Sequence, residues 1–108
     1  MANNFKSFLS KDIGTSASSV YTCPSATQTT LIGLSIGNTT TSNVTASAYI
    51  TRSGVDYFIV RNASVPVGGS LVAVGGDMKV VLQPSDVLKV VSSAASSLDA
   101  VASLLEIS

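Results

Sequence analysis

The sequence predicts an all-β protein, a single antiparallel β-sandwich of jelly-roll-like form, with about eight strands and an N-terminal arm. From residue 19 onward, apolar and polar side chains alternate with the period of two that is typical of strands burying one face. Gly, Pro, Asn and Ser interrupt this alternation at roughly the spacing expected between the strands of a sandwich or barrel. A length of 108 residues suits one domain, which we assign to residues 17–108, after an arm at 1–16.

The N-terminal segment, residues 1–16, differs from the rest because its apolar residues do not alternate, and their spacing fits either one or two amphipathic helical turns or an extended arm. Phe5, Phe8 and Leu9 lie among Lys and Ser residues, and Gly14 with the Ser and Thr residues after it is typical of a flexible joint. Exposed Phe side chains are unfavourable in water unless a partner covers them. We therefore expect Phe5, Phe8 and Leu9 to dock on a partner. The alternative is that the segment folds back onto the core of its own subunit.

The first half of the body contains four expected strands. Alternation over 20–23 ends at Pro24, and a second alternating run covers 31–36. The segment 44–51 is the clearest half-buried strand, because four apolar residues alternate there with Thr, Ser and Tyr. The dipeptide Ser53-Gly54 then favours a tight turn into 55–61, so residues 43–61 are predicted to form a β-hairpin.

The second half contains shorter expected strands at 71–74, 78–82 and 87–92, separated by Gly-Gly-Asp and Pro-Ser-Asp turns. The segment 98–107 is predicted to be the last strand. A helix over 95–106 is the alternative, since its Ala and Leu residues also fall near helical spacing. Period-two alternation, Val101 and Ile107 favour the strand.

The last expected strand is apolar on both faces, with Val101, Leu105 and Ile107 on one of them. A strand of this kind is central in a sheet or covered by another subunit. We therefore expect these three residues to form an oligomer interface. The low charge of the chain, six basic and six acidic residues, favours the same conclusion, and we expect a homo-oligomer, with a trimer preferred.

The composition argues against catalysis, cofactors, metals and nucleic acid. There is no His to activate a Ser, Thr or Cys nucleophile, and Cys23 before a Pro is more typical of a small buried residue. Asp77 and Asp86 follow turn-forming residues, and the chain contains no calcium-loop pattern. The chain also lacks a basic patch for phosphates, an apolar run long enough to span a bilayer, and an N-terminal apolar stretch of signal-peptide length. We expect no enzyme activity, no catalytic, cofactor or metal site, and synthesis in the cytoplasm.

Glycan binding is an alternative function, because β-sandwich proteins often bind sugars on exposed aromatic side chains. Tyr49 faces away from its apolar neighbours on the expected hairpin, and Tyr57 lies on the opposite strand. Cross-strand packing or an interface contact also explains both residues, and we prefer that explanation.

Several stretches of the chain resemble small virion structural proteins of tailed bacteriophages, particularly marine and cyanobacterial ones. They are distributed over nearly the whole chain: KDIGT at 11–15, VYTCP at 20–24, TLIGL at 30–34, YFIVRNA at 57–63, PVG at 66–68, VGGD at 74–77, VLQ at 81–83, DVLKV at 86–90 and SSLDA at 96–100. The resemblance implies a non-enzymatic protein of the virion, made in a bacterial host, that self-associates and docks on other virion proteins. In the alternative, it is a glycan-binding host-recognition module of the same particle.

Overall fold

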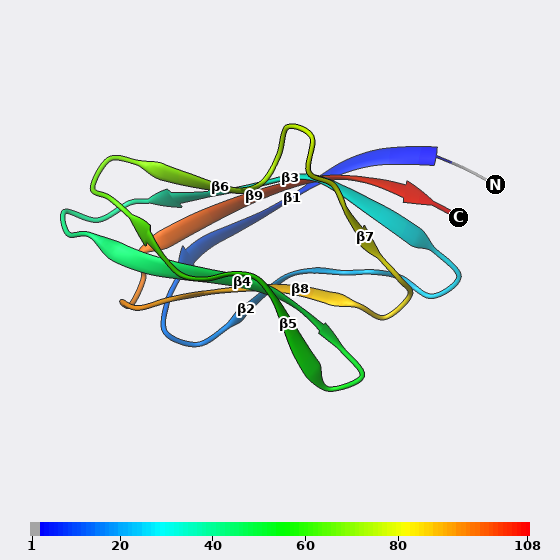
Figure 1. The fold of residues 1–108 in the computed structure, drawn as a ribbon, viewed down its shortest axis with the longest axis horizontal. Helices are drawn as coiled ribbons and strands as arrows, with labels where there is room; N and C mark the ends of the chain where they lie inside the picture. The colour runs from blue at the N-terminus through cyan, green and yellow to red at the C-terminus, as the bar shows by residue number, and fades with distance from the viewer. Residues whose placement is uncertain (1–2) are drawn as a thin grey trace.

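Residues 3–108, the part of the chain that the computed structural model describes, form nine β-strands and no helix. The strands make two antiparallel sheets that stack as two layers (Figure 1). The predicted all-β sandwich is confirmed. There is one strand more than the eight expected, because residues 3–13 also form a strand.

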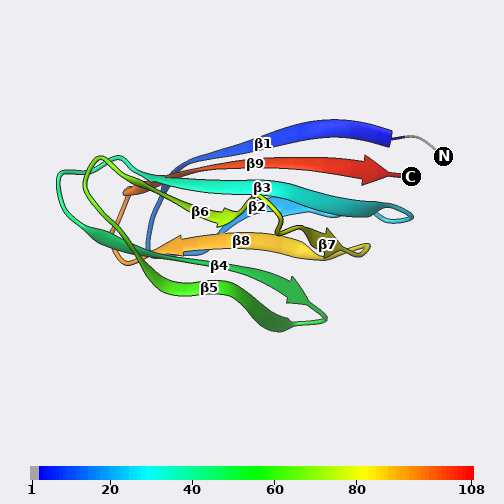
Figure 2. The same ribbon diagram turned by 45° about the horizontal axis from the view of Figure 1, so that its top comes forward.

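Sheet A contains the longest strands and has the order β1-β9-β3-β6, with β7 also paired to β3. Figure 2 shows β1, β9 and β3 side by side along this sheet. Its strands are β1 (Asn3–Ile13), β9 (Leu98–Ile107), β3 (Gln28–Asn38), β6 (Ser70–Val74) and β7 (Val80–Leu82).

Sheet B has the order β2-β8-β4-β5. Its strands are β2 (Ser18–Thr22), β8 (Val87–Ser92), β4 (Val44–Arg52) and β5 (Val55–Val65). β4 and β5 form the predicted hairpin, which continues four residues beyond the expected end at 61. Its turn residues Ser53 and Gly54 both have positive φ, the backbone geometry of the tight turns that match the twist of a hairpin.

The core lies between the sheets and is built by the period-two alternation. β9 shows this most clearly, because Leu98, Ala100, Ala102 and Leu104 are all buried while Val101 between them is exposed. Side chains from both sheets meet those of β9 there. The largest fully buried ones are Ile13, Leu31, Leu34, Ile36, Leu82, Leu88, Leu98 and Leu104.

The expectation of a separate N-terminal arm is wrong for residues 3–13. β1 pairs with β9 from Asn3 opposite Ile107 to Ile13 opposite Leu98, so it is an edge strand of the sandwich. Ile13 is fully buried, and the ring of Phe8 lies 4.8 Å from the ring of Tyr21, centroid to centroid. The alternative, that the segment folds back onto its own core, describes these residues. Residues 1–2 of the expected arm lie outside the described part of the chain.

Gly14, expected to be a flexible joint, is held in place by the loop between β8 and β9. Its carbonyl accepts a hydrogen bond from the backbone N–H of Ser92 at 2.9 Å. A Cβ at this position would lie 3.2 Å from the backbone nitrogen of Ser96, so only glycine fits here without displacing that loop. The close approach explains the glycine better than flexibility does.

The segment 95–106 is not a helix. Residues 98–107 form β9, as the alternation favours, and β9 pairs with β1 on one side and β3 on the other. A central position in the sheet explains why a strand needs apolar residues on its inner face. The apolar residues on its outer face need a separate explanation.

Candidate association surface

The outer face of sheet A, which points away from sheet B, exposes an unusual number of large apolar side chains. Phe5 and Leu9 on β1 are 78% and 73% exposed. Val101 on β9, Val72 on β6 and Val81 on β7 are also exposed. These five residues come from four strands of one sheet, and soluble proteins rarely leave such a group uncovered.

Strand register aligns these residues in two rows across the sheet. We call the first ridge the row Phe5, Leu105, Thr30 and Val81, and the second ridge the row Leu9, Val101, Ser35 and Val72. Between them lies a row here called the trough: Ser7, Ser103 and Gly33, with Ile32 in a β-bulge beside Gly33. Over β1 and β9 the outer face therefore has two rows of large apolar residues with two serines between them, whereas on β3 the ridges contain Thr30 and Ser35.

None of these residues is charged. Lys6 and Glu106 belong to the same sheet but point to its inner side, where Glu106 is buried. Lys11, Asp12 and Asp99 lie beyond the second ridge, where the Asp12 backbone N–H donates to Asp99 Oδ1 at 3.0 Å. The ridges and the trough are thus an uncharged area, bordered by these charges beyond the second ridge and by Asp77 and Lys79 in the loop between β6 and β7.

The residues predicted for partner docking and for oligomerisation meet on this surface. Phe5 lies opposite Leu105, and Leu9 lies opposite Val101. Leu105 and Ile107 are half-buried on the same face. Phe8 is different, because it points inward and packs against the core, so it is not available to a partner.

Val72 and Val81 were not singled out from the sequence. Both lie in short apolar strands in which hydrophobicity alone does not show which side faces the core. Their place on the surface follows from register, since Val72 pairs with Ser35 and Val81 pairs with Thr30.

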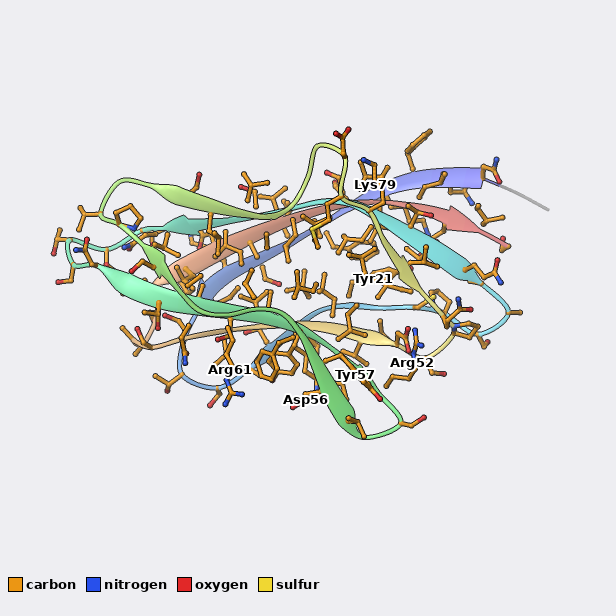
Figure 3. The ribbon with its side chains drawn as sticks, in the orientation of Figure 1. Tyr21, Arg52, Asp56, Tyr57, Arg61 and Lys79 are labelled. Carbon is orange, nitrogen blue, oxygen red and sulfur yellow. The ribbon has the colours of Figure 1, made fainter. Side chains whose placement is uncertain are left out.

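The inner side of sheet A holds a buried polar cluster next to the first ridge. The Tyr21 hydroxyl, which lies between the two sheets (Figure 3), donates a 2.6 Å hydrogen bond to Glu106 and lies 2.8 Å from Thr29 Oγ1. Lys6 Nζ is 2.9 Å from the other oxygen of Glu106. The hydrogen bonds from Tyr21 and Lys6 lower the pKa of Glu106, whereas burial and the bond to Glu106 raise the pKa of Tyr21.

The outer face of sheet B differs from that of sheet A because it carries charged side chains. Tyr49 does lie on this face, as its alternation predicts, but it is only 8% exposed because Phe58 covers it, with ring centroids 4.8 Å apart. The Arg61 guanidinium stacks on Phe58 at 4.9 Å from the ring centroid. Thr51 donates a 2.7 Å hydrogen bond to Asp56 beside them. Tyr49 therefore offers no flat ring to a sugar.

A pocket of about 170 Å³ opens at the hairpin end of the sandwich and is lined by Ile50, Arg52 and Tyr57. Tyr57 is 58% exposed there, and Figure 3 labels it and Arg52 at this end of the molecule. Arg52 is already paired, since its Nε and Nη2 donate to the two oxygens of the buried Asp86 at 2.8 and 2.5 Å. The pairing with Arg52 lowers the pKa of Asp86. No local pattern indicated this pair, because its residues lie 34 positions apart in the chain.

Within residues 3–108, no three His, Cys, Asp or Glu side chains come together in a way that could hold a metal ion. Cys23 is buried, and its Sγ lies 3.3 Å from Thr29 Oγ1. Residues 3–108 contain no helix long and apolar enough to cross a membrane.

No known protein family matches the sequence, and no curated protein matches it either. The fold is similar to that of a subunit of Bacillus endospore appendages, which are described as a novel family of disulfide-linked pili. The similarity covers 99% of this chain and 87% of the appendage chain, with a TM-score of 0.54 and 12% identical residues. At that identity, the likeness concerns the fold alone.

Proposed function

We propose that this chain is a non-enzymatic structural subunit that self-associates and docks on other proteins of a larger assembly. Following the sequence resemblance, that assembly is the virion of a tailed bacteriophage. The observation that carries the proposal is the uncharged outer face of sheet A, with Phe5 and Leu9 more than 70% exposed on it. Covering these side chains stabilises an assembly by roughly 25 cal/mol for each Å² of apolar surface removed from water.

The appendage subunit supports the proposal in one respect, because a similar fold occurs there in a protein described as forming pili. The linkage differs. The described appendages are disulfide-linked, whereas this chain has a single cysteine, Cys23, whose side chain is 1% exposed. Copies of this chain would therefore associate through non-covalent contacts.

A comparison of two valine variants tests self-association. Val101→Asp places a carboxylate on the second ridge, where a covering subunit would have to bury it at a cost of several kcal/mol. Val55→Asp is the matched control, since Val55 is exposed to a similar extent, 50% against 45%, but lies on the hairpin of sheet B. We expect sedimentation to show that Val101→Asp dissociates the oligomer and that Val55→Asp does not.

A wild-type protein that remains a monomer at all accessible concentrations would refute self-association. The virion assignment needs its own measurement, which is antibody labelling of purified phage particles. Labelling at a regular position on head, neck or tail is the expected result.

A glycan-binding host-recognition module is the second candidate, and the exposed Tyr57 beside the hairpin pocket is the observation that favours it. In that case Tyr57→Ala abolishes binding on a glycan array while Tyr49→Phe leaves it intact, because Tyr49 is covered by Phe58. The absence of any glycan bound by the wild-type protein would eliminate this candidate.

A further inference from the structure

We infer that two copies of this chain pack face to face through the outer faces of sheet A, with a ridge of each copy seated in the trough of the other. This inference rests on the proposed function and specifies it, since it names the occupant of the surface and the mode of contact. In the alternative mode, copies join edge to edge into a continuous sheet. The edge strands of both sheets have features that disfavour this mode.

The area of the face suits a stable pair. β1 and β3 each contain 11 residues, which span about 36 Å at about 3.3 Å per residue. Four strand positions across the sheet, at about 4.8 Å each, give a width of about 19 Å. The footprint of about 700 Å² is close to the roughly 800 Å² that each partner contributes to a standard protein interface.

The charge pattern favours a second copy as the occupant. The ridges and the trough are uncharged, so two such faces meet without repulsion and without burying an unpaired charge. A strongly charged partner, such as a nucleic acid, would find no opposite charges here. The outer face of sheet B carries Asp56, Arg61 and Lys89 and is suited to remain in water.

The relief of the face makes it complementary to itself. Residues two apart along a strand are about 6.6 Å apart, so the trough lies midway between ridges about 13 Å apart. A two-fold axis parallel to the ridges, and halfway between one ridge and the trough, places that ridge of each copy over the trough of the other. Over β1 and β9, Ser7 and Ser103 leave room there for Phe5 and Leu105, or for Leu9 and Val101.

The edges of both sheets carry features that oppose strand addition. On β1, Lys6 points inward to Glu106 and is 47% exposed, so a strand added beside β1 would cover its charged group. β5 is interrupted by register shifts opposite residues 46–49 of β4, which disturb its edge. The other edges are short, with five residues in β2, five in β6 and three in β7. Inward charges, bulges and short strands are the usual protections against edge-to-edge association.

Such a pair is isologous and has two-fold symmetry. It is a dimer, or the building unit of an assembly with two-fold axes. In this respect the inference departs from the trimer that the sequence favoured.

The decisive variant is Ser103→Leu, which fills the trough and makes the face more apolar. Ridge-into-trough packing predicts that the dissociation constant of the pair, measured by sedimentation of the full chain, rises at least tenfold. Non-specific hydrophobic association predicts instead that the dissociation constant falls. Ser64→Leu is the matched control on an exposed position of β5, and we expect it to have no effect.

Circular dichroism and the melting temperature verify that each variant folds. Ser7→Leu fills the same trough from β1 and replaces Ser103→Leu if that variant does not fold. A dissociation constant that is unchanged or lower in the folded trough variant, while Val101→Asp still dissociates the protein, would overturn the inference and leave the proposed function standing.

Hydrogen–deuterium exchange distinguishes face from edge. Face-to-face packing leaves the outward backbone amides of β1 exchanging at the same rate in monomer and dimer. Protection of these amides that increases with protein concentration would overturn the inference in favour of edge pairing. A wild-type chain that never associates would refute the inference together with the proposed function.

Discussion

Tyr21→Phe tests the energetic role of the buried cluster behind the first ridge. The substitution removes only the hydroxyl that donates to Glu106 at 2.6 Å, and keeps the ring that packs against Phe8. A hydrogen bond to a charged acceptor contributes about 2 kcal/mol, and one between neutral groups about 1 kcal/mol. We therefore expect the free energy of unfolding to fall by about 2 kcal/mol at neutral pH, which lowers the melting temperature by about 10 °C in a domain of this size.

The destabilisation caused by Tyr21→Phe should decrease as the pH falls, because the hydroxyl of Tyr21 bonds to an ionised Glu106. The pKa of Glu106 is lowered in the folded protein, first by the bond from Tyr21 and then by the bond from Lys6. This contribution to stability is complete above the ordinary carboxyl pKa of 4.5 and is lost as the pH falls through the lowered value. The variant lacks the bond from Tyr21, so it loses less stability when Glu106 is protonated. The difference in unfolding free energy between wild type and variant therefore becomes smaller on acidification.

Urea unfolding of wild type, Tyr21→Phe and Tyr57→Phe across a pH series measures both effects at one fixed protein concentration. Tyr57→Phe is the control, since Tyr57 is exposed and no hydrogen bond is assigned to its hydroxyl among residues 3–108. If Tyr21→Phe destabilises no more than the control, or if its effect is the same at neutral pH and below about pH 4, the reasoning about Glu106 is wrong.

The remaining predictions concern β1 and the Arg52–Asp86 pair. Phe8→Ala should lower stability by about 2 kcal/mol because its ring packs against the core, and Phe5→Ala should change it by less than about 0.5 kcal/mol; equal effects in thermal unfolding would contradict this difference. A chain shortened to begin at Thr15 should unfold or aggregate, since it lacks β1, and a soluble protein with an unchanged melting temperature would show that β1 is dispensable. Asp86→Asn should cost about 2 kcal/mol at neutral pH, with a smaller cost in acid because the pKa of Asp86 is lowered by Arg52; chemical unfolding at two pH values measures it, and a constant cost would argue against the ion pair.

The fold was predictable where one face of a strand is buried and the other is not. The β4–β5 hairpin and β9 were both recognised from alternation, and the Ser53-Gly54 turn from its residue types. β1 was missed for a physical reason. As an edge strand that exposes Phe5 and Leu9 on one side and Lys6 on the other, it shows no separation of apolar from polar residues along the chain.

The association surface was predictable only in part. Val101 and Leu105 were identified because β9 is apolar on both faces, and Phe5 because it lies outside any alternating pattern. That these residues lie in common rows depends on pairing between β1 and β9, nearly 100 residues apart. Local sequence patterns carry no information about such pairing, and for the same reason they did not indicate the bond between Tyr21 and Glu106.

The central position of β9 has a consequence for how the chain folds during synthesis. β9 is the last strand of the sequence, yet it lies between β1 and β3, which a ribosome produces first. Until β9 emerges, β1 has no partner in sheet A, and Phe5, Phe8 and Leu9 are exposed on an unpaired strand. Sheet pairings so distant in sequence form slowly, and unpaired apolar strands favour aggregation. Translation rate and chaperone supply should therefore limit the yield of soluble protein more than the stability of the finished fold does.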